Sequence, residues 1–166
     1  MLRWIGLFTL LLVLLTGSNA AADIEYERET LRGLRGIRVV VERLPPEAER
    51  DGLTRSTIQT DVELKLRQAG IPLLSRADRP PGSPYLYVNV NTYQSRVGLY
   101  AFSVQAGLVQ FVILERNRNI TSQATTWEAT GSVGAVGSEK LSEVRNAVRD
   151  MVDEFINAYL AVNPKQ

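Results

Sequence analysis

The sequence predicts an α/β fold of the α+β type: a two-layer sandwich in which two helices cover one face of a mixed, mostly antiparallel sheet of about five strands. Alternating apolar and polar residues at 85–94 and 99–114 predict long strands with one buried face. Apolar residues recur at helical spacing over 54–69 and 138–162, which predicts two helices that each bury one side. A chain of 166 residues is long enough to form a core of this kind.

Residues 1–20 have the pattern of a secretory signal peptide. Arg3 supplies a short basic region, Trp4–Leu15 is mostly apolar, and small residues follow, so we expect cleavage after Ala20 or Ala22. The alternative is a retained membrane anchor, but the apolar stretch is shorter than the roughly 20 residues that a span needs. We therefore expect a periplasmic or secreted protein whose mature chain has no membrane span.

A charged lead-in over residues 23–36 precedes a single expected domain over residues 37–163. The lead-in is compatible with either a short helix or an irregular segment. Ile37–Glu42 is rich in β-branched residues, and its nearly continuous apolar run predicts a strand at the centre of the sheet.

The first long helix is expected over residues 54–69. Its apolar face consists of four residues at helical spacing: Ile58, Val62, Leu66 and Ala69. Gly70 suits the position that follows the last turn. The next segment, Ile71–Leu74, predicts a short strand at an edge of the sheet, because Pro72 has no N–H to donate to a neighbouring strand.

Three longer strands are expected to follow as a meander. The strand at 85–94 buries Leu86, Val88 and Val90, and the strand at 99–114 buries a second alternating set: Tyr100, Phe102, Val104, Ala106 and Leu108. Gly107 is a candidate for a β-bulge, because the alternation becomes ambiguous after it. Residues 116–119 predict a turn, and residues 120–131 predict the returning strand.

The last helix is expected over residues 138–162, with Ser138 as its N-cap and Asn163 and Pro164 at its end. Three glycines precede it: Gly131, Gly134 and Gly137. Backbone N–H groups before a helix can bind an anion, but neither of the common phosphate-binding glycine motifs is present. We therefore interpret residues 131–138 as a flexible connection.

The segment over residues 53–74, Leu-Thr-Arg-Ser-Thr-Ile-Gln-Thr-Asp-Val-Glu-Leu-Lys-Leu-Arg-Gln-Ala-Gly-Ile-Pro-Leu-Leu, resembles the helix and strand of small envelope α/β domains. These include the amino-terminal domain of TolB and the periplasmic domain of the curli secretion protein CsgG. Phe155–Leu160 fits the end of the C-terminal helix in the same layout. The whole chain also resembles uncharacterised secreted bacterial proteins. The resemblance implies a fold and a compartment, and it implies no activity.

The candidate ligand-binding residues alternate along one predicted strand: Tyr85, Tyr87, Asn89, Asn91 and Tyr93. On an exposed sheet face, tyrosines can stack on a ligand and asparagines can hydrogen-bond to it. The structural interpretation is that Tyr favours strands and pairs well with side chains on neighbouring strands. Both interpretations place the five side chains on one face.

Charged residues at helical spacing predict three local ion pairs: Asp61–Lys65, Glu63–Arg67 and Arg149–Asp153. Together with Asp150 and Glu154 they form the densest acidic groups of the chain. We interpret these groups as solvated helix faces rather than as catalytic carboxylates.

Cys and His are both missing from the chain, which excludes disulfides, thiol nucleophiles, His-assisted triads and histidine metal sites. The 19 basic and 18 acidic residues nearly balance, so the basic footprint of a nucleic-acid-binding protein is missing. We expect no catalytic residues, no metal and no cofactor.

These observations predict a non-enzymatic envelope protein that works as a protein-interaction module. Its docking surface would be the exposed sheet face, or the sheet edge on the side of the meander, where a partner strand could add. The alternative is a domain that binds a small ligand or a peptide on the Tyr/Asn row. We expect an envelope protein as the partner, and the sequence leaves the oligomeric state open.

Overall fold

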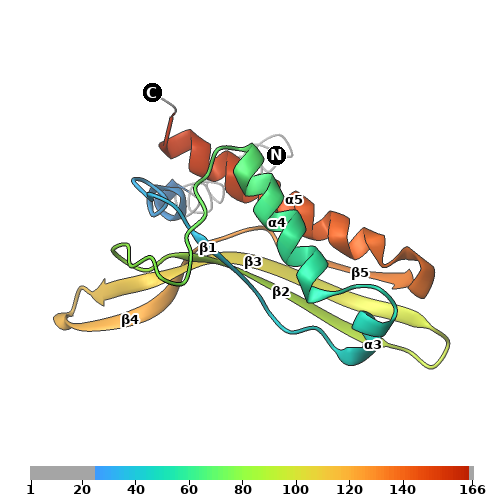
Figure 1. Ribbon diagram of the computed structural model, residues 1–166. Coiled ribbons are helices and arrows are strands. Elements are labelled where there is room, and N and C mark those ends of the chain that lie inside the picture. The colour runs from blue at the N-terminus through green and yellow to red at the C-terminus, as the bar shows by residue number, and fades with distance from the viewer. Residues whose placement is uncertain (1–24, 165–166) are drawn as a thin grey trace, which may run out of the picture.

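The computed structural model describes residues 25–164. Its two long helices, α4 (Arg55–Gln68) and α5 (Ser142–Val162), lie side by side on one face of a five-stranded sheet (Figure 1). This confirms the predicted two-layer α+β sandwich. The predicted signal peptide and its two cleavage positions lie outside the described residues.

The sheet is built around one central strand. Its five strands are β1 (Arg38–Val41), β2 (Tyr85–Gln94), β3 (Leu99–Leu114), β4 (Asn117–Glu128) and β5 (Ser132–Gly137). Strand β1 is parallel to β2, and all other pairs are antiparallel. Strand β3 pairs with β2 on one side and with both β4 and β5 on the other. The sheet is therefore mixed and mostly antiparallel, as predicted.

Strand β1 lies at an edge of the sheet, so the prediction of a central strand is wrong. The apolar run does not mean that both faces of the strand are buried. Ile37 and Val41 are buried, whereas Val40, on the other face, is only partly covered. The edge strand expected at Ile71–Leu74 is reduced to one bridge between Leu73 and Ile37. Pro72 contributes its C=O there, which accepts a 3.0 Å hydrogen bond from the backbone N–H of Ile37.

Residues 131–138 were predicted to be a flexible connection because of their glycines. That prediction is wrong, since strand β5 occupies this segment. Gly134 lies opposite Phe102 on β3. A Cβ atom at position 134 would come within 2.7 Å of the Phe102 ring. The glycine is therefore present because an aromatic ring fills the space beside it, and it does not interrupt the strand.

The hairpin between β3 and β4 turns earlier than expected. Leu114 pairs with Asn117, so β4 begins inside the turn predicted at 116–119. The register of the pair shifts between Leu108 and Val109, so a bulge lies next to Gly107, but Gly107 itself is paired and β3 has no extra residue there. Thr126 is the extra residue on β4 at this bulge, since Thr125 and Trp127 pair with consecutive residues of β3.

Helix α4 has the predicted bounds and buried face. The Thr54 side chain accepts a 3.2 Å hydrogen bond from the backbone N–H of Thr57, and Gly70 adopts a φ of 79° after the last turn. Helix α5 differs at its start. A short 3-10 helix, η1 (Ser138–Lys140), precedes it, so Ser138 does not cap α5. A short helix that the sequence did not predict, α3 (Pro46–Arg50), follows β1.

The core lies between the helices and the inner face of the sheet. Its largest fully buried side chains include Tyr100 and Phe155. The ring of Trp127, at the end of β4, meets that of Phe155 edge to face, with centroids 5.2 Å apart. This contact joins the β3–β4 hairpin to α5.

The charged lead-in packs against the end of α5. Residues 25–29 are helical, and Leu31 is fully buried in the core. The Asn163 side chain donates a 2.9 Å hydrogen bond to the Leu31 carbonyl and accepts a 2.8 Å hydrogen bond from the Gly33 N–H. The Tyr159 hydroxyl donates to the Leu34 carbonyl at 3.0 Å. We call this set of contacts the terminal clasp.

Candidate functional site

The five predicted binding residues share one face of β2. Leu86, Val88 and Val90 alternate with them and are buried under the helices. The row therefore points to the opposite side of the sheet, which we call the outer face: Tyr85, Tyr87, Asn89, Asn91 and Tyr93. Figure 1 shows both long helices on the other side of the sheet.

Two tyrosines of the row are held by charged residues of β1 and its end. The Arg38 guanidinium carbon lies 5.7 Å from the centre of the Tyr85 ring. The Tyr87 hydroxyl donates a 2.6 Å hydrogen bond to the Glu42 carboxylate. That hydrogen bond, with a contribution from burial, raises the pKa of Tyr87 to about 12, and it lowers the pKa of Glu42. This half of the row is therefore occupied by contacts within the molecule.

The other half of the row is open. Tyr93 is 73% exposed, and Asn91 is exposed as well. The residues that face this half from β3 are short or polar: Ala101, Ser103 and Gln105. A ligand or a partner could reach the exposed Asn91 and Tyr93 without displacing a neighbouring side chain, whereas Asn89 is half-buried.

Large apolar side chains emerge from the same outer face at the far end of β3. Val109 pairs with Tyr85, so the alternation of the strand places Phe111 and Ile113 on the same side. Phe111 is 46% exposed and Ile113 is 63% exposed. Sequence reasoning missed these two residues, because the alternation of β3 could not be assigned to a face beyond the bulge.

A cavity of about 480 Å³ lies beside the terminal clasp. Its polar lining includes Glu27, Arg28, Glu128 and Glu154, and Trp127 forms part of its apolar wall. Glu154 accepts a 2.9 Å hydrogen bond from the backbone N–H of Thr130. Three separate segments contribute these residues, so no local sequence pattern could have indicated the cavity.

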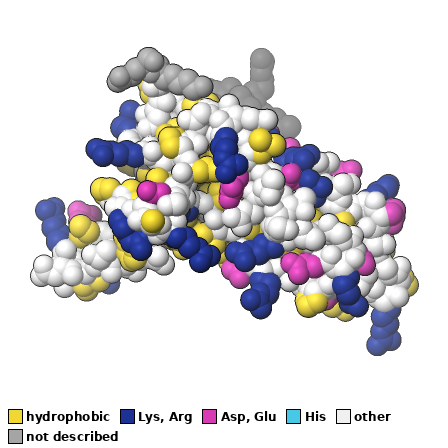
Figure 2. All heavy atoms as spheres, viewed as in Figure 1, with side chains coloured by type: hydrophobic (Ala, Val, Ile, Leu, Met, Phe, Trp, Pro, Cys, Tyr) yellow, Lys and Arg dark blue, Asp and Glu magenta, His cyan; other side chains and the backbone are white. Residues whose placement is uncertain are grey.

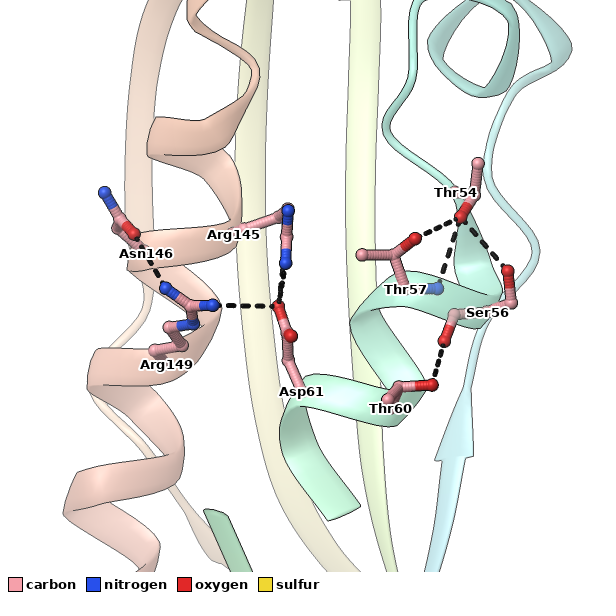
Figure 3. A network of polar contacts seen from close by, with 8 residues as sticks. All are labelled: Thr54, Ser56, Thr57, Thr60, Asp61, Arg145, Asn146 and Arg149. Atoms are coloured by element: carbon pink, nitrogen blue, oxygen red, sulfur yellow. Dashed lines mark hydrogen bonds and ion pairs between the residues drawn. The ribbon is translucent and has the colours of Figure 1, made fainter. Parts of the chain in front are cut away.

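The acidic residues of the helices join α4 to α5. One oxygen of the Asp61 carboxylate accepts hydrogen bonds from Arg145 at 2.7 and 3.0 Å and from Arg149 at 3.4 Å (Figure 3). Lys65 pairs with Asp153 of α5 at 2.5 Å. The predicted local pairs Asp61–Lys65 and Arg149–Asp153 are therefore wrong. The Glu63–Arg67 pair is present, at 2.8 Å.

Charges of both signs are interspersed over the surface shown in Figure 2. Within residues 25–164, no group of three or more Asp or Glu side chains has the geometry of a metal site. In the same part of the chain, no helix has the length and apolar character needed to cross a membrane.

Comparison with known proteins finds little likeness. No family model matches the chain, and no curated protein matches it in sequence. Among solved structures, a minor lipoprotein from Acinetobacter baumannii is similar, with 16% sequence identity and a TM-score of 0.34. The match covers 75% of this chain and 92% of that chain. A TM-score of this size carries no inference about function.

Proposed function

We propose that this protein is an exported, non-enzymatic interaction module of the cell envelope that docks a protein partner on the outer face of its sheet. One observation carries the proposal: α4 and α5 both pack on the inner face (Figure 1), and the outer face exposes Tyr93, Phe111 and Ile113. Large exposed apolar and aromatic side chains on one surface are typical of protein-binding sites.

Export is supported by the sequence of residues 1–20, and the way the domain is stabilised is compatible with it. The chain contains no Cys, so its stability outside the cytoplasm would rest on packing alone. The core extends from Leu31 in the lead-in to Val162 at the end of α5. Such a core would hold the fold in an oxidising compartment without disulfides.

A protein partner fits the outer face better than a small molecule does. Small-molecule sites are usually concave and bury most of their ligand. Three cavities lined by described residues lie elsewhere, since none of their linings includes a residue of the Tyr/Asn row. The Tyr85 and Tyr87 half of the row is already engaged with Arg38 and Glu42.

A role without catalysis is supported by the hydrogen-bonded pair of Tyr87 and Glu42 on the outer face. A general base or acid works best with a pKa near the working pH. The hydrogen bond to Glu42 raises the pKa of Tyr87 further from neutral pH, to about 12. This pair is suited to fixing the end of β1 against β2.

Binding of a small ligand or a peptide remains the second candidate, because Tyr93 is 73% exposed and adjoins Asn91. The double substitution Tyr87→Ser with Tyr93→Ser separates the two. If the row binds a ligand, the rise in melting temperature that the ligand causes should disappear in the variant. An unchanged rise would exclude the row as the site.

Photo-crosslinking in cells tests the proposed docking face. A photoreactive amino acid at Tyr93 or Phe111 should give an adduct whose mass exceeds that of this chain by a constant amount, the mass of the partner, and that differs from the mass of a dimer of this chain. The matched control is Leu64 on α4, which is 50% exposed on the helical side. Equal yields of the same adduct from Leu64 would contradict docking on the outer face, as would no adduct from either outer position.

A further inference from the structure

The edge of the sheet formed by β4 is open. Residues 119–125 contain no charge, no Pro and no Gly, and among the described residues their strand pairs only with β3. The open stretch ends there, because the Thr30 hydroxyl of the lead-in donates a 3.0 Å hydrogen bond to the Thr126 carbonyl. The opposite edge is covered: Leu73 bridges Ile37 beside β1, and the Arg55 side chain donates a 2.7 Å hydrogen bond to the Val41 carbonyl. Proteins usually protect an edge strand with charge, Pro or a cover, and an unprotected edge pairs readily with another strand.

The backbone groups that face this open edge can be identified. The Phe111 N–H donates to the Gly82 carbonyl on the β2 side, at 2.8 Å, so the backbone groups of Phe111 point away from β4. Its cross-strand neighbour Gln123 then belongs to a pair without mutual hydrogen bonds, and the N–H and C=O of Gln123 point outward. By the same alternation, the N–H and C=O of Thr121 and Thr125 also face the open edge.

The edge is complementary to itself when two copies run antiparallel with Gln123 opposite Gln123. Thr121 of each copy then faces Thr125 of the other, and all three positions offer outward N–H and C=O groups. Such a pairing would form about six backbone hydrogen bonds. Arg118 and Glu128 lie at equal distances along the sequence on either side of Gln123, and both are exposed. Each copy thus places an acidic residue near a basic residue of the other.

We propose that two copies of this chain join through β4 in an antiparallel, two-fold symmetric pair centred on Gln123, which makes one continuous sheet of twice the width. A two-fold axis uses the same patch on both copies, as most homodimers do. The dimer deepens the proposed function, on which it rests, because it places two outer faces side by side for one partner.

A single cysteine tests the register. The chain has no Cys, so Gln123→Cys introduces the only thiol. Opposite residues in a hydrogen-bonded antiparallel pair have Cα atoms about 5.5 Å apart, a distance that a disulfide spans. Under mild oxidation, the Gln123→Cys variant should form a covalent dimer. Thr121→Cys or Thr125→Cys alone should form little, because each faces the other position, whereas the double variant should form the dimer again.

Charge placement at the same positions tests the pairing without oxidation. Thr121→Asp with Thr125→Asp sets like charges opposite each other and should convert the dimer to monomer in sedimentation velocity. Thr121→Lys with Thr125→Asp sets opposite charges against each other and should keep the dimer. Circular dichroism of both variants should match the parent, since these side chains are exposed on β4.

The proposal is overturned if the parent sediments as a monomer at micromolar to millimolar concentration, or if all three single cysteines crosslink equally. It is also overturned if the two charge variants dissociate to the same extent. Its failure is distinguishable from failure of the proposed function. A monomer that still forms partner adducts from Tyr93 and Phe111 would overturn the dimer and leave the proposed function in place. A dimer that forms no such adducts would overturn the proposed function and leave the dimer in place.

Discussion

Two tyrosines on neighbouring strands have raised pKa values for different physical reasons. Tyr87 lies on the outer face, and its hydrogen bond to Glu42 is the main cause. Tyr100 is fully buried under the helices, and burial is the main cause of a pKa that also reaches about 12. The Tyr100 hydroxyl donates a 2.7 Å hydrogen bond to Asp51, so this buried side chain contacts an exposed carboxylate.

Tyr100→Phe should make the protein less stable at neutral pH and less sensitive to alkali. The folded-state pKa, about 12, exceeds the ordinary value of about 10, so the stabilisation is complete below pH 10 and is lost as the pH rises toward 12. Loss of the hydrogen bond should cost about 1 kcal/mol at pH 7. Urea unfolding followed by Trp127 fluorescence at pH 7, 9 and 11 measures both effects.

The matched control for this variant is Tyr93→Phe, which changes a tyrosine that is exposed. Its stability at pH 7 should equal that of the parent. If Tyr100→Phe shows the same decline in unfolding free energy above pH 10 as the parent, the buried phenol is not a source of that decline.

Gly134→Ala should destabilise the protein, because the new Cβ would overlap the Phe102 ring. Overpacking of this kind typically costs about 1–3 kcal/mol. Gly131→Ala is the control, since a Cβ there meets its nearest atom at an ordinary 3.8 Å. Thermal unfolding of both variants checks the prediction, and equal melting temperatures would contradict it.

At the scale of elements, the two long helices are joined by charges that sequence spacing assigned to other partners. Asp61 lies between Arg145 and Arg149, and its side chain is 16% exposed. The Glu63–Arg67 pair lies within α4, with an arginine that is largely exposed. Pairs shielded from water interact more strongly than exposed pairs.

Asp61→Asn should therefore cost more than Glu63→Gln on the same helix. We expect a loss of about 1 kcal/mol for Asp61→Asn and a few tenths of a kcal/mol at most for Glu63→Gln. Chemical denaturation gives both values. A double-mutant cycle with Arg145→Gln should show a coupling that the cycle of Glu63 with Arg145 lacks. Additive effects in the first cycle would show that the contact between the helices contributes nothing.

Most of the elements could be predicted because each buries one face against the same core. The alternation of Leu86, Val88 and Val90 indicated both the strand and the face on which the Tyr/Asn row lies. Strand β5 could not be predicted, because its glycines suggested a loop. Gly134 is needed for another reason: the ring of Phe102, which is distant in the sequence, fills the space where a Cβ would lie. Phe111 and Ile113 are exposed because the pairing of Val109 with Tyr85 puts them on the outer face, and no local pattern records that pairing.

At the scale of the whole molecule, the lead-in is part of the folded unit. Leu31 is fully buried, and its neighbours in the lead-in are held by the terminal clasp. Leu31→Ala should cost about 2–5 kcal/mol, the range for a large buried side chain truncated to Ala. Leu64→Ala, at an exposed site on α4, should change stability by no more than about 0.5 kcal/mol. Comparable unfolding midpoints for the two variants would contradict a structural role for the lead-in.

The terminal clasp also determines when folding can finish. The hairpins of β2, β3 and β4 can form as soon as they are synthesised, because their pairing partners are close in sequence. Leu31 and Gly33 are made early, yet the side chain that binds them belongs to Asn163, beyond the last turn of α5. A nascent chain interrupted before that residue would hold formed hairpins around an unfinished core. Completion of the fold therefore waits until Asn163 has been synthesised.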